Sequence, residues 1–249
     1  MSGHNKWSSI KHKKSAEDAK RGKLFTKLVK EVIVSAREGG GDPDANPRLR
    51  TAINSCQNAN MPKANIERAI KRGTGELEGV NYEEATYEGY GHNGVAIFIE
   101  ALTDNKNRTV AEIRHTFTKY GGHLAESGAV DWLFDQKGLI VVKDNDFDED
   151  DFMLNAIEAG AEDILKEENE FHIYTAINDF HDVQKELEKQ DYKIEKAELT
   201  RIPKNNVKAD EVAEGLFTLI EKIEDLDDVQ KVYANYEVSD EVMERLAQD

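Results

Sequence analysis

The stretch from Gly138 to Leu199 opens on GLIVV (Gly138–Val142) and holds a second apolar run, FHIYT (Phe171–Thr175). Short runs rich in β-branched and aromatic residues, bounded by polar turns, predict buried strands. Around them the sequence predicts a helix over 148–159, strands at 163–165 and 192–199, and a helix over 179–190. The resulting order is βαββαβ, which is that of a ferredoxin-like domain. We place this domain at residues 137–199.

Strands and helices continue on both sides of this stretch. The runs 85–90 and 95–101 predict two strands, and Asn93-Gly94 between them predicts a hairpin. A helix over 107–119 and a strand over 129–134 come before the ferredoxin-like stretch; a helix over 209–223, a strand over 229–236 and a short terminal helix follow it. We therefore expect one α/β domain made of residues 79–136 plus 200–249, with the ferredoxin-like domain inserted in it.

The N-terminal part predicts a small helical bundle. Apolar residues recur at helical spacing over 21–38 and 47–59, and a third helix opens at Met61-Pro62 and stops at Gly73. Residues 1–78 form this predicted head. The fold class is thus α+β and multidomain: a helical bundle followed by two α/β domains, the last of them inserted in the middle one.

Charge divides the chain near the end of the predicted head. Residues 1–75 carry 16 Lys and Arg against 7 Asp and Glu, a net of +9, whereas the whole chain is formally -17. Residues 76–249 therefore carry -26. Solubility alone does not require opposite charges on two parts of one chain. A basic head on an acidic body predicts a polyanion partner for the head, and nucleic acid is the leading candidate.

The candidate contact residues are cations of the head. The helix over 21–38 has a basic arc opposite its apolar stripe, at about 100° per residue, formed by Lys20, Lys23, Lys27, Lys30 and Arg37. Acids are nearly absent from this arc, so pairing within the helix cannot neutralise it, and we expect it to face solvent and contact phosphates. A solvated face without any ligand is the simpler alternative. The candidate nucleic-acid-binding residues are Lys6, Lys11, Lys13, Lys14, Lys20, Arg21, Lys23, Lys27, Lys30, Arg48 and Arg50.

Two motifs that suggest other chemistry fail on their context. Gly89, Gly91 and Gly94 spell G-x-G-x-x-G, but a dinucleotide site needs a helix after the last glycine, and the residues that follow predict a strand. The acids from Asp144 to Asp148 resemble the start of a calcium loop, yet Glu149 stands where that loop requires glycine. We therefore expect no enzyme activity, no cofactor, no metal and no small-molecule substrate.

Composition sets the outer limits on the class of protein. No run approaches the roughly 18 apolar residues of a membrane span, and no apolar segment follows the N-terminal lysines as it would in a secretory signal. The single cysteine, Cys56, excludes an internal disulfide, and we expect it to be buried in the second helix. These features favour a cytoplasmic protein without a membrane partner.

Many short motifs of the sequence occur together in one known family. They are Gly3-His4-Asn5-Lys6-Trp7, Ile10-Lys11-His12-Lys13-Lys14, Arg21-Gly22-Lys23-Leu24-Phe25, Asn46-Pro47-Arg48-Leu49-Arg50, Asn60-Met61-Pro62-Lys63, Asn65-Ile66-Glu67-Arg68-Ala69-Ile70, Tyr87-Glu88-Gly89-Tyr90-Gly91, Ala101-Leu102-Thr103-Asp104-Asn105, Asn107-Arg108-Thr109, Glu126-Ser127-Gly128 and Trp132-Leu133-Phe134-Asp135. This set resembles the YebC/PmpR family over the whole chain, most strongly over residues 3–140. Departures are local: His92-Asn93 stands where many members have Pro-Gly, and Ala125 where many have Gly.

The resemblance implies a three-domain cytoplasmic protein that regulates gene expression. The family is usually described as probable DNA-binding transcriptional regulators. Other members, including the mitochondrial translational activator of cytochrome c oxidase, act on translation at the ribosome and ease synthesis of proline-rich stretches. No helix-turn-helix with base-reading side chains is evident in this sequence, and phosphate contacts alone do not specify a base sequence. DNA and ribosomal RNA both remain possible partners.

Overall fold

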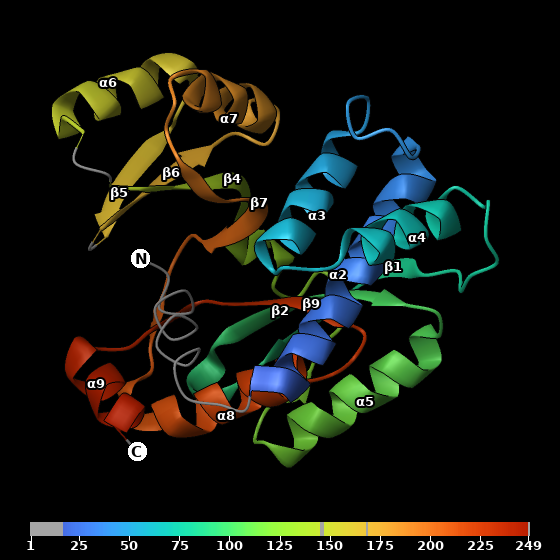
Figure 1. The fold of residues 1–249 in the computed structure, drawn as a ribbon. Helices are drawn as coiled ribbons and strands as arrows, with labels where there is room; N and C mark the ends of the chain where they lie inside the picture. Colours follow the sequence, from blue (N-terminus) through green and yellow to red (C-terminus); the bar gives the residue numbers. More distant parts are fainter. Residues whose placement is uncertain (1–16, 145–146, 168, 249) are drawn as a thin grey trace. The chain divides into compact units, whose positions relative to one another are not determined.

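The computed structural model describes residues 17–144, 147–167 and 169–248 (Figure 1). The chain divides into two compact units: unit 1 comprises residues 1–134 and 203–249, and unit 2 comprises residues 135–202. The chain thus leaves unit 1 after Phe134 and returns to it at Pro203. A further division of unit 1 into a head (1–78) and a middle domain (79–136 plus 200–249) stays a prediction.

Three helices of unit 1 form the head. They are α2 (Glu17–Gly39), α3 (Pro47–Asn58) and α4 (Lys63–Gly73). Their apolar faces meet in one cluster that includes Val32, Leu49 and Ile66, and Cys56 is fully buried in it, as expected. The Asn46 side chain accepts a hydrogen bond from the Leu49 amide and caps α3, whose first residue is Pro47. The three predicted helices are therefore confirmed.

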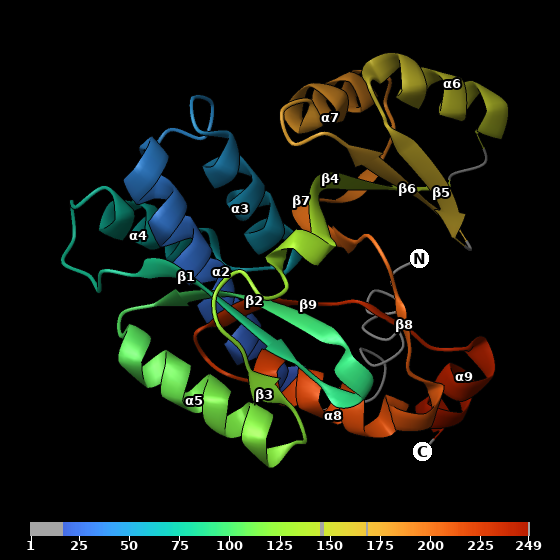
Figure 2. The ribbon, with the colours of Figure 1, turned by 180° about the vertical axis from the view of Figure 1, so that it is seen from behind.

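A four-stranded antiparallel sheet forms the rest of unit 1, in the order β3-β1-β2-β9. Its strands are β1 (Glu83–Tyr90), β2 (Ala96–Thr103), β3 (His123–Leu124) and β9 (Val229–Ala234). Helices α5 (Lys106–Lys119) and α8 (Ala213–Glu224) cover one face, where Ile97, Phe117 and Leu216 share a core (Figure 2). The β1–β2 hairpin is confirmed: Asn93 and Gly94 have φ of 56° and 75°, the left-handed values that an Asn-Gly turn supplies.

The strand expected over 129–134 is wrong. This segment is a loop with a short 3-10 helix, η2 (Asp131–Leu133), and the next strand starts only at Phe134. The buried carboxylate of Glu88 explains the difference, because it accepts hydrogen bonds from the amides of Gly128, Val130 and Asp131 at 2.7, 2.6 and 2.9 Å. Those amides are then unavailable to a strand ladder. The fourth strand of the sheet comes instead from β9, about 100 residues later in the chain.

Unit 2 confirms the ferredoxin-like prediction. Its elements are β4 (Phe134–Lys143), α6 (Glu149–Ala159), β5 (Asp163–Glu167), β6 (Glu170–Thr175), α7 (Phe180–Lys189) and β7 (Ile194–Pro203). The sheet order is β5-β6-β4-β7, with β6 antiparallel to both β4 and β5. Ile140 and Ile173 face each other across the β4–β6 pair and pack with Phe152 and Val183 of the two helices.

The C-terminal segment completes unit 1. It contains β8 (Val207–Lys208), which pairs in parallel with β10 (Tyr236–Glu237), the 3-10 helix η3 (Asp210–Val212) before α8, and the terminal helix α9 (Asp240–Gln248). Within residues 17–144, 147–167 and 169–248, no helix is both long and apolar enough to cross a membrane.

Candidate nucleic-acid interface

The predicted contact residues divide into those that the structure describes and those that it does not. Lys6, Lys11, Lys13 and Lys14 lie outside the described residues, as does the side chain of Lys20. Arg21 and Lys23 are exposed on α2, and the guanidinium of Arg21 lies 5.4 Å from the centre of the Phe25 ring. Lys27 is half-buried and Lys30 is buried, with 6% of its surface exposed.

The lysine arc of α2 lies against the C-terminal end of α8 and the turn that follows it. The Lys27 ammonium donates to the carbonyl of Glu224 at 2.8 Å, and the Lys23 ammonium donates to the carbonyl of Asp225 at 3.1 Å. Lys23 also pairs with the Asp225 carboxylate at 3.4 Å, where both side chains are about half exposed. The last carbonyls of a helix lack partners within it and carry its negative dipole end, so the two lysines cap α8. Burial outweighs the nearby acids and lowers the pKa of Lys27.

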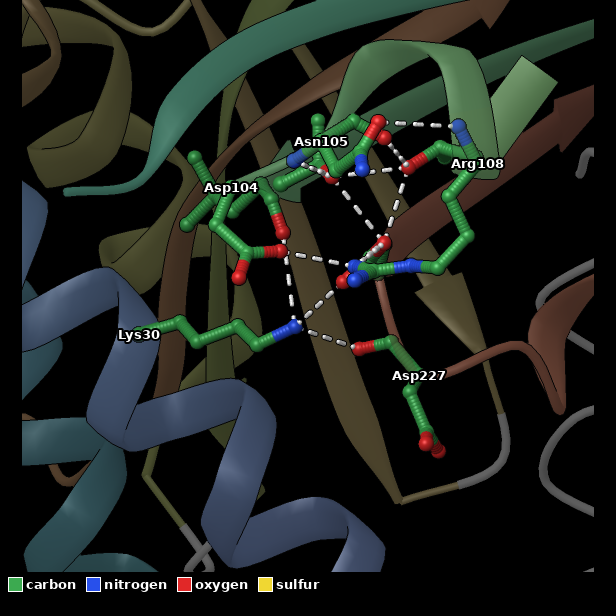
Figure 3. A network of polar contacts seen from close by, with 9 residues as sticks. Lys30, Asp104, Asn105, Arg108 and Asp227 are labelled. Carbon is green, nitrogen blue, oxygen red and sulfur yellow. Dashed lines mark hydrogen bonds and ion pairs between the residues drawn. The ribbon is translucent and has the colours of Figure 1, made fainter. Parts of the chain in front are cut away.

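Lys30 belongs to a buried ion-pair network that joins α2 to the start of α5 and to the 227–228 turn (Figure 3). Its ammonium donates to the Asp228 carboxylate at 2.8 Å and to the carbonyl of Asp227 at 2.9 Å. On the other carboxylate oxygen of Asp228, Arg108 donates at 2.6 Å, and the hydroxyls of Thr103 and Thr109 lie at 3.0 and 2.8 Å. Both oxygens of this carboxylate, which is 4% exposed, are therefore satisfied.

Hydrogen bonding governs the charge state of Asp228. Burial alone would raise the pKa of this carboxyl, but the hydrogen bonds from Lys30, Arg108 and Thr109 outweigh it and hold the pKa well below its ordinary value. The carboxylate is therefore ionised at neutral pH, opposite two cations. Removing one partner of such a pair would leave a buried charge without compensation.

The expectation that the whole lysine arc faces solvent is wrong for Lys30. A side chain that is 6% exposed and bonded to Asp228 is not available to a phosphate. Acids are nearly absent from the same face of the helix, as expected. The carboxylate that neutralises Lys30 comes instead from Asp228, near the other end of the sequence. Nucleic-acid contact by Lys23 and Lys27 stays a prediction, and each would have to give up or share its bond to the 224–225 segment.

Both arginines predicted on α3 are also engaged within unit 1. Arg48 makes ion pairs with Glu31, Glu38 and Glu84 at 2.8, 2.7 and 2.6 Å. Burial opposes its charge, but these bonds prevail and raise the pKa of the guanidinium. Arg50 donates to the backbone carbonyls of Pro43 and Asp44 at 3.0 and 2.8 Å. Their roles in nucleic-acid binding stay predictions, since the observed contacts already account for these groups.

The sequence reasoning passed over the cations of α4. Arg68, Lys71 and Arg72 are exposed on this helix, whose opposite face buries Ile66, Ala69 and Gly73. The same arc analysis that selected α2 would have found them, because they lie opposite an apolar stripe at helical spacing.

A polar cleft of about 590 Å³ lies beside the Lys30 network. It is lined by Thr26, Lys30, Tyr82, Asp104, Arg108, Glu112, Asp225, Leu226, Asp227 and Asp228. Within the described residues, no group of three or more His, Cys, Asp and Glu side chains could hold a metal ion. Four of its seven charged lining residues bond to one another: Lys30, Asp104, Arg108 and Asp228.

Two family models match this chain. The model described as the TACO1/YebC protein N-terminal domain matches residues 5–76, and the model described as the TACO1/YebC second and third domain matches residues 82–236. The chain belongs to the TACO1/YebC family. This membership agrees with the motif resemblance and with the mixed α+β fold described above.

Relatives in the family are similar over their full length. A protein from Halothermothrix orenii named "Probable transcriptional regulatory protein" is 54% identical and covers 100% of each chain. One of the same description from Geobacter sulfurreducens is 56% identical over 99% of this chain and 100% of its own. The crystal structure of a conserved hypothetical protein from Aquifex aeolicus has a TM-score of 0.83 at 49% identity, covering 93% of this chain and 96% of that one. The names of the two relatives from Halothermothrix orenii and Geobacter sulfurreducens thus describe probable regulators of transcription.

Proposed function

We propose that this chain is a nucleic-acid-binding regulator of gene expression that acts on transcription by binding DNA. The carrying observation is the division of charge, +9 over residues 1–75 and -26 over the remainder. A polyanion is attracted to the head and repelled by the acidic body, so binding through the head is electrostatically directed. The names of full-length relatives support the regulatory role.

A second candidate is a ribosome-associated translation factor that binds ribosomal RNA and eases synthesis of proline-rich stretches. This candidate is favoured because the side chains of Arg48 and Arg50 already bond to other residues of unit 1. Reading a base sequence in a DNA groove needs side chains that are free to bond base edges, and arginine on guanine is the commonest such contact. Both arginines of α3 already bond within unit 1. Binding through phosphates alone suits a shaped RNA target more than a promoter sequence.

Crosslinking in cells followed by sequencing of bound DNA and RNA from the same sample tests both candidates. A transcriptional regulator will enrich defined promoter fragments, and the purified chain will prefer them over random DNA by roughly 10³-fold or more. A translation factor will enrich ribosomal RNA and co-sediment with ribosomes, and its loss will increase stalling at proline runs without changing the levels of the affected mRNAs. Enrichment of neither nucleic acid would refute both candidates.

A further inference from the structure

Most cations of the described head are already bonded within unit 1. On α2, Lys23, Lys27 and Lys30 bond to residues 224–228, and Arg37 donates to Asn81 and to the carbonyl of Tyr82. Arg48 and Arg50 of α3 are engaged as described above. A ligand for the head must therefore use other cations or displace these contacts.

Two places among the described head residues are exceptions: Arg21, whose guanidinium lies over the Phe25 ring, and the outer face of α4. The side chains of Arg68, Lys71 and Arg72 are exposed, and none of the three has a hydrogen bond or ion pair within the part of the chain that the structure describes. At about 100° per residue, the three lie within an arc of about 100° whose centre is nearly opposite the buried Ile66 and Ala69. Figure 1 shows α4 beside α2, at the outer side of the head.

This arc is basic without internal compensation. The single acid of α4, Glu67, lies at the edge of the arc and pairs with Lys63 at 3.8 Å. Glu76, in the following turn, accepts a hydrogen bond from the Thr74 hydroxyl at 3.0 Å. The Cβ of Arg72 lies near Gly79, 3.3 Å from the position that an added Cβ would take there.

We propose that the α4 arc formed by Arg68, Lys71 and Arg72 is the surface of the head that contacts the phosphodiester backbone of nucleic acid. The proposal rests on the proposed function and specifies its contact surface. The α4 arc takes the role that the sequence assigned to Lys30, which is buried on α2. Free guanidinium groups bind phosphate oxygens in a bidentate manner without first breaking an internal bond. DNA and RNA share this chemistry, so both serve as probes.

The test measures binding of the full chain to a short mixed-sequence DNA duplex and to a single-stranded RNA of the same length, over 50 to 200 mM salt. Each neutralised phosphate contributes about 0.9 to the log–log salt slope on duplex DNA and about 0.7 on single strands. Replacing Arg68, Lys71 and Arg72 with glutamine should flatten the slope by about 2.7 on duplex DNA and by about 2.1 on single-stranded RNA. On the duplex, the loss of affinity relative to the unaltered chain should then be about 40-fold greater at 50 mM than at 200 mM salt.

The matched control replaces Lys185, Lys189 and Lys193 of unit 2 with glutamine, which changes the net charge equally. A second variant, Arg68→Lys with Arg72→Lys, keeps the charge and should keep the slope. Circular dichroism and thermal unfolding establish that each variant is folded. The expected result is a flattened slope in the α4 triple variant alone.

Three results would overturn the proposal. An unchanged slope in the folded α4 variant, with the unaltered chain still binding, would show that these cations only stabilise the end of the helix, and would leave the proposed function intact. If the salt slope flattens equally in both triple variants, the effect comes from net charge and the α4 arc makes no local contact with phosphates. Failure of the unaltered chain to bind either probe would refute the proposed function and this inference together.

Discussion

Asp228 is the carboxylate on which cations from two helices converge. Lys30 from α2 and Arg108 from α5 meet there, and two threonine hydroxyls complete its shell. Neither cation alone indicates such a site in the sequence, because 198 residues separate Lys30 from Asp228. The network explains why a lysine lies on the polar side of α2 and is nevertheless buried.

Replacing Asp228 with asparagine should destabilise unit 1 by about 3–5 kcal/mol at neutral pH, because the substitution removes the buried carboxylate that pairs with Lys30 and Arg108. The pKa of Asp228 in the folded chain is held below its ordinary value of 3.8. Its contribution to stability is therefore complete above that value and is lost as the pH falls through the folded pKa. The gap between the unaltered chain and Asp228→Asn should accordingly narrow below about pH 4. Urea denaturation over a pH series measures this.

The control is Asp104→Asn, which removes a partly exposed partner of the same Arg108. Exposed ion pairs contribute about 0–1 kcal/mol, so this variant should remain close to the unaltered chain at every pH. Equal destabilisation by the two substitutions would show that burial of Asp228 has no special energetic role.

Helices α2 and α4 approach each other closely at a glycine. An added Cβ at Gly73 would lie 2.5 Å from the Ile33 carbonyl oxygen and 2.7 Å from the Ala36 Cβ, both on α2. The sequence suggested that Gly73 only ends its helix. Close packing against α2 is a further reason for glycine at this position.

Gly73→Ala should destabilise the head by about 1–3 kcal/mol, the usual cost of forcing extra volume into a packed interface. Gly22→Ala is the matched control, because Gly22 lies in the same head on α2, with no atom within 4 Å of its added Cβ. Alanine favours a helix over glycine, so Gly22→Ala should be neutral or slightly stabilising. Urea denaturation compares the two variants, and equal midpoints would contradict the packing argument.

Local patterns predicted most elements, and long-range contacts account for the errors. The three head helices and the βαββαβ order follow from hydrophobic periodicity and turn residues, which are properties of neighbours in the sequence. The loop at 129–134 is apolar and strand-like, but Glu88, some 40 residues earlier, binds its amides. The solvent-exposed position expected for Lys30 is wrong for the same reason, because no residue near Lys30 in the sequence indicates that Asp228 is its partner. The free cations of α4 were within reach of sequence reasoning and were missed.

The division into two units has an energetic consequence for the full chain. Each unit has its own buried core, with Phe117 and Leu216 in one and Phe152 and Phe171 in the other. Chains with separate cores often open in separate cooperative steps. A substitution that strains one core should then leave the exchange of the other core's amides unchanged.

Gly138→Ala in β4 tests this independence. An added Cβ would lie 2.3 Å from the Thr175 hydroxyl oxygen and 2.5 Å from the Phe180 ring, so the core of unit 2 must shift. Amide hydrogen exchange followed by mass spectrometry should show faster exchange in residues 135–202 and unchanged exchange in the β1–β2 hairpin. Asp228→Asn should give the reciprocal pattern, because its network lies wholly in unit 1. If either substitution accelerates amide exchange in both units to the same extent, the two cores open as one cooperative structure, which would contradict the independence of the units.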